Sequence, residues 1–227
     1  MGIPPIQPYP MPTEADLPPN VPSWQPDPGR AVLLIHDMQR YFVDMFPGGT
    51  SPVVELLANV DRLRRAAAAL RIPVVYTAQP GRMSRHRRGL LFDFWGPGMS
   101  TDPQVREIAR EVGPGPGDSI VTRHRYSAFH ESRLAEVIQA HRRDQLLVCG
   151  VYAHVGCLLT ACEAFSRDIQ PFLVADAVAD FTAQDHRMAL EYAARICAVT
   201  LTTDRLLATL CRPVAVPAGT FGFVRHQ

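Results

Sequence analysis

An aspartate at the end of an apolar run is the residue of this chain best placed for acid–base chemistry. Residues 31–42 read A-V-L-L-I-H-D-M-Q-R-Y-F, and the apolar part of this run ends at Asp37. A short run that is apolar on both faces is typical of a buried parallel strand, and open α/β sheets bind ligands at the carboxyl ends of such strands. Two interpretations fit the position: Asp37 is a catalytic carboxylate, or it caps the turn or helix that follows.

Three further polar segments follow predicted strands. Gln79 lies in T-A-Q-P-G, Arg123 and Arg125 lie in T-R-H-R-Y-S-A-F, and Tyr152 lies in C-G-V-Y-A-H-V-G-C. If the strands are parallel, all of these residues meet Asp37 at one edge of the sheet. In the last segment the backbone N–H groups of residues 155–157 would open a helix, where they can bind an anion. The alternative is an ordinary strand-to-helix turn that needs glycine for tight packing.

The elements that must position these residues alternate along the chain. Apolar runs predict six strands, at residues 32–36, 74–78, 120–122, 145–149, 172–175 and 198–202. Apolar residues at the helical period predict helices between most of them, at residues 52–70, 103–112, 131–141, 155–167 and 184–195. Ser51 before Pro52 and Asp102 before Pro103 match an N-cap followed by proline in the first turn. We therefore expect a three-layer α/β/α domain with a six-stranded parallel, Rossmann-like sheet.

Two stretches interrupt this alternation. Residues 1–30 hold ten of the 21 prolines, which predicts an extended arm that wraps its own domain or a partner subunit. We expect a catalytic domain at residues 31–212 after this arm, followed by a tail at residues 213–227. The connection 79–100 is over twenty residues long, and loops of that length are usually functional. The cations and aromatics of this connection predict an anion-binding wall, and the alternative is a mobile solvated loop. These cations and aromatics are Arg85, His86, Arg87, Arg88, Phe92, Phe94 and Trp95.

Composition excludes several classes of function. The chain has 227 residues, 47% of them hydrophobic, and a net charge of +1, so we expect one domain, no nucleic-acid partner and no membrane partner. Its five cysteines form no C-x-x-C pair, which argues against a disulfide framework and a zinc site, and the N-terminus lacks a signal-peptide pattern. We expect a cytoplasmic protein with no cofactor and no metal. All 23 basic residues are arginine, so no lysine takes part in its mechanism.

Several long motifs resemble the isochorismatase family, in order and in spacing, over nearly the whole chain. They are H-D-M-Q-R-Y-F, Y-T-A-Q-P-G, R-G-L-L-F-D-F-W-G-P-G-M, R-Y-S-A-F, D-Q-L-L-V-C-G-V-Y-A-H-V-G and D-I-Q-P-F-L-V-A-D-A-V-A-D-F. Within the family, the chain is most similar to the stand-alone type of phenazine pathways, which acts on isochorismate or 2-amino-2-deoxyisochorismate. The resemblance implies a homodimer that hydrolyses the enolpyruvyl vinyl ether of such a substrate and releases pyruvate.

The resemblance also implies roles for eight residues. Asp37 would be the general acid that protonates the terminal methylene carbon; water would then add to the oxocarbenium ion, and the hemiketal would collapse without any covalent nucleophile. Arg123 would be the second catalytic residue. The implied substrate contacts are Gln79, Arg88, Tyr152 and the backbone of Gly156, with Phe42 and Trp95 as apolar walls. A cis peptide is implied before Tyr152.

The chain departs from the pattern of the wider superfamily at Gly156. Amidases of the superfamily carry a cysteine nucleophile at this position. The neighbouring Cys157 would point about 100° away around a helix. A cysteine-dependent amidohydrolase is therefore an alternative, but one that needs a misdirected thiol to act.

A second departure lies beside the catalytic acid. Family members carry T-K-W-R-Y-S-A-F, whereas this chain has arginine at position 123. A permanent cation favours the ionised form of Asp37 and so opposes its role as an acid. Three outcomes follow: Arg123 acts as a substrate clamp at some loss of rate; the substrate carboxylates neutralise Arg123 and restore the pKa of Asp37; or the protein is an impaired or non-catalytic member that binds a pathway intermediate or a carrier-protein partner. We favour the second.

Overall fold

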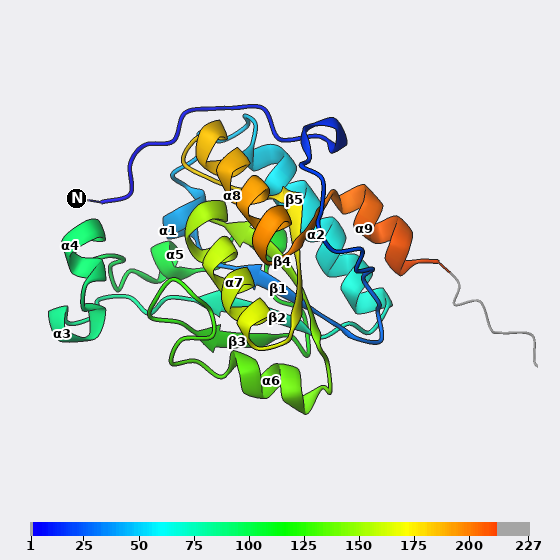
Figure 1. Ribbon diagram of the computed structural model, residues 1–227. Coiled ribbons are helices and arrows are strands. Elements are labelled where there is room, and N and C mark those ends of the chain that lie inside the picture. The colour runs from blue at the N-terminus through cyan, green and yellow to red at the C-terminus, as the bar shows by residue number, and fades with distance from the viewer. Residues whose placement is uncertain (1, 213–227) are drawn as a thin grey trace, which may run out of the picture.

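The computed structural model describes residues 2–212, so the predicted tail at 213–227 lies outside the described residues. Six parallel strands form one sheet in the order β3-β2-β1-β4-β5-β6, with helices on both faces (Figure 1). The three-layer α/β/α fold predicted from the sequence is confirmed. The strands are β1 (Ala31–His36), β2 (Val74–Ala78), β3 (Ser119–Thr122), β4 (Gln145–Val151), β5 (Gln170–Ala179) and β6 (Val199–Leu201).

Alternate residues of the central strand face two separate apolar cores. Leu33 and Ile35 of β1 pack with helices α2 (Val53–Ala69) and α9 (Thr203–Leu210). Val32 and Leu34 lie in the core under the opposite layer, which consists of α6 (Leu134–Ala140), α7 (Leu158–Ser166) and α8 (Ala183–Ile196). Because both faces are covered, β1 is buried along its whole length and apolar up to its last residue, His36, as is typical of a central parallel strand.

The predicted helix at residues 103–112 is wrong. The short helix α5 (Pro103–Arg106) begins at the predicted cap Asp102, but the chain is extended at Glu107 and forms only a 3-10 turn, η2 (Arg110–Val112), after it. Here the backbone bonds to the segment after β1: the Arg40 N–H donates to the Glu107 carbonyl (2.8 Å) and the Ala109 N–H to the Met38 carbonyl (2.8 Å). This pairing supports the chain just beyond Asp37, a long-range contact that helical periodicity does not reveal.

Other helix boundaries also differ from the predictions. The Ser51–Pro52 bond is cis and Pro52 itself is the N-cap of α2, so Ser51 is not the cap. The helix predicted at 155–167 begins earlier, with a π-helical turn, η3 (Ala153–Cys157), that leads into α7. A short helix that was not predicted, α1 (Arg40–Val43), follows β1. The connection after β2 carries two more short helices, α3 (Arg85–Arg88) and α4 (Leu91–Trp95), at one end of the molecule (Figure 1).

The proline-rich segment before β1 packs on its own domain. It is extended apart from one 3-10 turn, η1 (Glu14–Asp16), and it runs along the outside of the molecule (Figure 1). Ile6 and Tyr9 are buried, and the Tyr9 hydroxyl accepts a hydrogen bond from the Asp180 N–H (2.7 Å). Asn20 pairs with both backbone groups of Thr200. No helix within residues 2–212 is long and apolar enough to cross a membrane.

Candidate active site

One pocket lies at the carboxyl ends of β1 to β4. In the strand order, β1 lies between β2 and β4. The chain after β1 adds strands β2 and β3 on one side and strands β4 to β6 on the other, so the boundary between β1 and β4 is a topological switch point. Open α/β folds bind ligands in the crevice at such points. The pocket encloses about 520 Å³ of space, part of it open to solvent. Arg125, which was also expected to meet Asp37, does not line it and donates to the Arg87 and His124 carbonyls. The eight residues to which the resemblance assigns roles all line it: Asp37, Phe42, Gln79, Arg88, Trp95, Arg123, Tyr152 and Gly156.

The Asp37 side chain lines the pocket at the carboxyl end of β1 and caps no helix. Its φ of 52° lies in the left-handed region, which Asp tolerates better than most residues and which turns the chain sharply after β1. The Thr77 hydroxyl of β2 accepts from the Asp37 N–H (3.0 Å) and donates to Asp37 Oδ1 (2.7 Å). The N-cap of α1 is Gln39, without a side-chain bond, so the capping interpretation of Asp37 is wrong.

Arg123 pairs with Asp37 through two hydrogen bonds. Its Nε donates to Oδ1 (2.8 Å) and its Nη2 donates to Oδ2, and both side chains are buried. Burial raises the pKa of the Asp37 carboxyl, but the charge of Arg123 and the hydrogen bonds from Arg123 and Thr77 outweigh it, so the pKa lies below its ordinary value. In the unliganded protein Asp37 is therefore a carboxylate and not an acid.

Gln39 holds Gln79 in place, a role that the sequence motifs did not reveal. The Gln39 side chain accepts from the Gln79 N–H (2.7 Å) and donates to the Gln79 carbonyl (3.1 Å) and to the Arg106 carbonyl (2.8 Å). This clamp leaves the Gln79 amide 3.4 Å from Asp37 Oδ2. Gln39 is buried, and its position two residues after the catalytic candidate was the signal available in the sequence.

The connection after β2 forms one side of the pocket with only two of its seven predicted cations and aromatics, Arg88 and Trp95. The other five do not line the pocket: Arg85, His86, Arg87, Phe92 and Phe94. Arg88 is only 4% exposed; its Nε donates to the Gly96 carbonyl (2.5 Å), while its Nη1 has no partner among the described residues. Gly98 has a φ of +75°, and a Cβ there would lie within 2.8 Å of the Arg88 guanidinium. The Trp95 Nε1–H donates to the Tyr126 hydroxyl (2.8 Å), which joins this wall to the segment that carries Arg123.

The turn after β4 differs from the predicted open helix N-terminus. The Val151–Tyr152 peptide is cis, as the resemblance implied. The N–H groups of Val155, Gly156 and Cys157 all converge on the Tyr152 carbonyl oxygen, at 3.2, 3.1 and 3.2 Å. These three donors therefore already have an acceptor, because the π-turn gathers them onto one oxygen. The cationic side chains that line the pocket are Arg88 and Arg123.

Cys157 lies on the far side of the turn from the pocket. It is fully buried in the apolar core under α6, α7 and α8. Burial raises the pKa of its thiol well above the ordinary value, so the thiol stays protonated and unreactive. A cysteine-dependent reaction has no suitable nucleophile at this turn.

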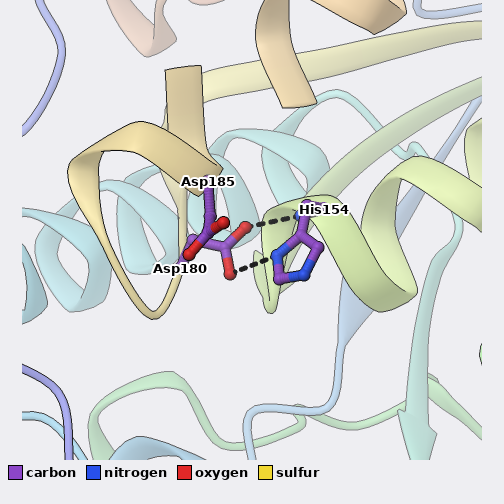
Figure 2. Close-up of side chains that lie close together, drawn as sticks. All are labelled: His154, Asp180 and Asp185. Atoms are coloured by element: carbon purple, nitrogen blue, oxygen red, sulfur yellow. Dashed lines mark hydrogen bonds and ion pairs between the residues drawn. The ribbon is translucent and has the colours of Figure 1, made fainter. Parts of the chain in front are cut away.

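A cluster of His154, Asp180 and Asp185 lies beside the same turn (Figure 2) and has its donor atoms within 4.8 Å of one another. Asp180 accepts from the His154 N–H (2.6 Å) and bonds His154 Nδ1 (2.7 Å). Asp185 accepts from the Thr182 hydroxyl, which caps α8. These hydrogen bonds link η3 to Asp180, directly after β5, and close the N-terminal cap of α8.

His154 makes stability depend on pH. Burial lowers its pKa, but the hydrogen bond and charge of Asp180 raise it more, so the pKa lies above the ordinary value of 6.5. A group with a raised folded-state pKa stabilises the fold fully below its unfolded pKa and loses this effect as pH rises through the folded value. We expect Tm to fall between pH 6 and pH 8.5, and His154→Gln to flatten this slope. An unchanged slope in thermal denaturation of the variant would contradict the assignment.

Several residues that line the pocket were not singled out from the sequence. Tyr41, Tyr126 and Phe181 lie within the quoted motifs, which was the signal available for them. Ile3, from the extended arm, had no such signal, because nothing local shows that the arm returns to the sheet. The remaining ones are Leu91, Val151 and Val155.

The parallel sheet and a carboxylate–guanidinium–amide group at its strand ends define an isochorismatase-like hydrolase. The family model described as "Isochorismatase domain" matches residues 31–205, and the chain belongs to this family. It is 56% identical to an isochorismatase of Bacillus subtilis, over 92% of this chain and 67% of the relative. It is 53% identical to the phenazine biosynthesis protein PhzD of Pseudomonas fluorescens, over 91% of this chain and 99% of the relative.

The fold likeness extends to distant structures. A cysteine hydrolase from Pseudomonas syringae superposes with a TM-score of 0.74 at 23% identity, and the match covers 85% of this chain and 97% of that one. At this identity the likeness concerns the fold alone. The chemistry of the present site follows from its own residues.

Proposed function

We propose that this protein hydrolyses the enolpyruvyl vinyl ether of isochorismate or 2-amino-2-deoxyisochorismate. The products are pyruvate and a dihydro-hydroxybenzoate or dihydro-hydroxyanthranilate, within a secondary-metabolite pathway. The observation that carries this proposal is the placement of a buried aspartate, two buried arginines and an amide in one pocket that aromatic side chains enclose. The names of the relatives, an isochorismatase and a phenazine biosynthesis protein, support the same substrate class.

The charges of the pocket suit a substrate with two carboxylates. Arg88 and Arg123 are both buried, and the Arg88 Nη1 lacks a partner among residues 2–212. A buried unpaired donor is costly, so a carboxylate that accepts its hydrogen bond is strongly favoured. The ring and the vinyl ether are apolar and match Phe42, Trp95 and Phe181. We assign Arg88 and Arg123 to the substrate carboxylates.

The reaction requires that Asp37 carry a proton, whereas the free protein holds it as a carboxylate. In our proposal a substrate carboxylate draws the Arg123 guanidinium away from Asp37, and the negative charge of the substrate then raises the pKa of the buried Asp37. Asp37 can next protonate the methylene carbon, and Gln79 orients the carboxyl group from its clamped position. Water adds to the resulting cation, and the hemiketal collapses to pyruvate and the ring product.

A second candidate function follows from the same ion pair. If Arg123 stays bound to both oxygens of Asp37 after the substrate enters, the acid stays ionised and the protein binds its ligand without turnover. Such a protein would hold a pathway intermediate or a carrier-protein partner. The paired geometry of the unliganded site is the observation that favours it.

A coupled pyruvate assay separates the two functions. Purified protein is incubated with each substrate, and pyruvate is followed by NADH oxidation with lactate dehydrogenase, with a related isochorismatase as the positive control. We expect turnover of at least one substrate. Binding without pyruvate release, under conditions in which the control enzyme works, would establish the second function.

Arg88→Met tests the assignment of Arg88. Loss of a buried charged hydrogen bond to a substrate carboxylate is expected to raise KM about 10- to 100-fold with a smaller change in kcat. The matched control is Arg87→Met, because Arg87 is exposed and is the neighbour of Arg88 on the same short helix. Equal effects of both substitutions on KM would refute a specific contact.

A homodimer and a cytoplasmic location belong to the same proposal. Exposed apolar side chains gather on α7 and α8, which lie side by side on one face (Figure 1), and a second copy would cover them: Leu159, Phe165, Met188, Tyr192 and Ile196. The five cysteines are free, which suits a reducing compartment. Light scattering of the purified protein is expected to give twice the mass of the chain.

A further inference from the structure

His36, the last residue of β1, lies next to Asp37 and has no part in the chemistry proposed above. Its side chain is fully buried, and its Nδ1 lies 2.9 Å from the Val151 carbonyl oxygen, to which the Nδ1–H donates. Burial lowers the pKa of His36 to about 4, so the ring is neutral at physiological pH. Its Nε2 has no hydrogen-bond partner within the described part of the chain. The bond to Val151 and the packing around the ring hold it in place.

Two glycines make room for His36. A Cβ at Gly150, whose φ is +111°, would lie 2.1 Å from the His36 carbonyl oxygen and 2.7 Å from its backbone nitrogen. A Cβ at Gly156 would lie 2.2 Å from the ring atom Cε1, 2.8 Å from Nε2 and 2.9 Å from Nδ1. Real Cβ atoms essentially never approach other atoms closer than 3.0 Å. The backbone of His36 therefore requires glycine at position 150, and its ring requires glycine at position 156.

The contact with Gly156 bears on the pocket, because Gly156 lines it and His36 does not. The ring lies behind this part of the wall. The hydrogen bond to the Val151 carbonyl fixes the ring relative to the end of β4. Val151 directly precedes the turn that carries Gly156, so the ring is also fixed relative to this turn. The ring cannot move aside without losing its hydrogen bond to Val151.

We propose that His36 is a positioning residue that determines the type of hydrolysis: its ring occupies the space that any side chain at position 156 would need. The pocket wall at this point is therefore bare backbone. No side chain, and so no nucleophilic one, can project from position 156 toward a substrate held near Asp37. Water is left as the attacking group.

Thermal denaturation of a double-substitution cycle tests this exclusion. Gly156→Ala in the otherwise unchanged protein is expected to lower Tm by about 5 °C or more, because overpacking a buried contact is destabilising. In the His36→Ala background the same substitution is expected to change Tm by less than about 1 °C, since the ring is gone. An equal fall of Tm in both backgrounds would overturn the proposal.

Gly150→Ala is the matched control. Its Cβ would meet the backbone of His36, which His36→Ala leaves in place. We expect Gly150→Ala to lower Tm equally with His36 or alanine at position 36. Relief of this clash by His36→Ala would show that the substitution loosens the whole region and would overturn a ring-specific exclusion at position 156.

Thiol labelling shows whether the freed space opens into the pocket. In a protein with His36→Ala and Gly156→Cys, the introduced thiol is expected to react with iodoacetamide at least about tenfold faster than Cys157, which is buried and has a raised pKa. Mass spectrometry of the peptide resolves the two sites. Labelling no faster than that of Cys157 would mean that position 156 does not face the pocket even when the ring is removed.

These measurements do not depend on turnover. The Tm cycle and the labelling rates test the role of His36 even if no variant releases pyruvate, a result that would count against the proposed function alone. Where pyruvate is released, we also expect kcat lost through Gly156→Ala to be partly restored in the double variant, which a purely structural defect of His36→Ala would not achieve.

Discussion

Replacement of Asp37 by asparagine is expected to lower kcat for pyruvate release by about 10³-fold or more, because a general acid contributes about 10² to 10⁴ to rate. Asparagine has nearly the same shape and can still accept hydrogen bonds from Thr77 and Arg123, but it cannot deliver a proton to the methylene carbon. Steady-state kinetics in the coupled assay measure the loss. Tm of the variant shows whether the fold is retained.

The control for this substitution is Asp44→Asn. Asp44 lies seven residues further on, is exposed and pairs only with Arg40 in the described structure, so its loss should leave kcat unchanged. Full activity of the Asp37→Asn variant would remove Asp37 as the acid. Loss of activity with loss of the folded state would instead require the Asp37→Glu variant, which retains an acid and should keep part of the rate.

Arg123→Lys is expected to leave kcat unchanged or to raise it by up to about tenfold. A tenfold rise corresponds to an increase of about one unit in the pKa of Asp37, which raises the protonated fraction of the acid about tenfold. Arginine binds both oxygens of Asp37 and keeps its charge, whereas lysine is a point donor whose own pKa falls on burial. The lysine variant should therefore hold the ionised form of Asp37 less strongly. Steady-state rates across pH 5 to 9 measure the change.

The pH profiles of the unchanged protein test the same idea. The profile of kcat/KM reports the free protein, in which the pKa of Asp37 is lowered, and the profile of kcat reports the complex. Since the acid must be protonated, both rates fall as pH rises through the relevant pKa. We expect the fall in kcat at higher pH than the fall in kcat/KM, and Arg123→Lys should bring the two profiles together. A kcat for Arg123→Lys more than tenfold lower would mean that the guanidinium itself is needed to hold the substrate.

Much of the fold was predictable because its signals are local. Each predicted strand is a short apolar run, and the six runs match the six strands to within a few residues. The helix at 103–112 was wrong because its backbone pairs with the segment after β1, far away in the sequence. The anion site at residues 155–157 was expected from the usual geometry of a helix start, and the π-turn at Tyr152 replaced it.

The sequence by itself determined which residues meet at the site. Parallel strands end at one edge of the sheet, so Asp37, Gln79, Arg123 and Tyr152 had to converge once the alternation of strands and helices was recognised. Only the tertiary structure decided how they meet. Asp37 and Arg123 are 86 residues apart, and their two-bond pairing, like the contact of the His36 ring with Gly156, depends on distances through space. Periodicity along a chain carries no information about such distances, because they arise only when separate strand ends are packed against one another.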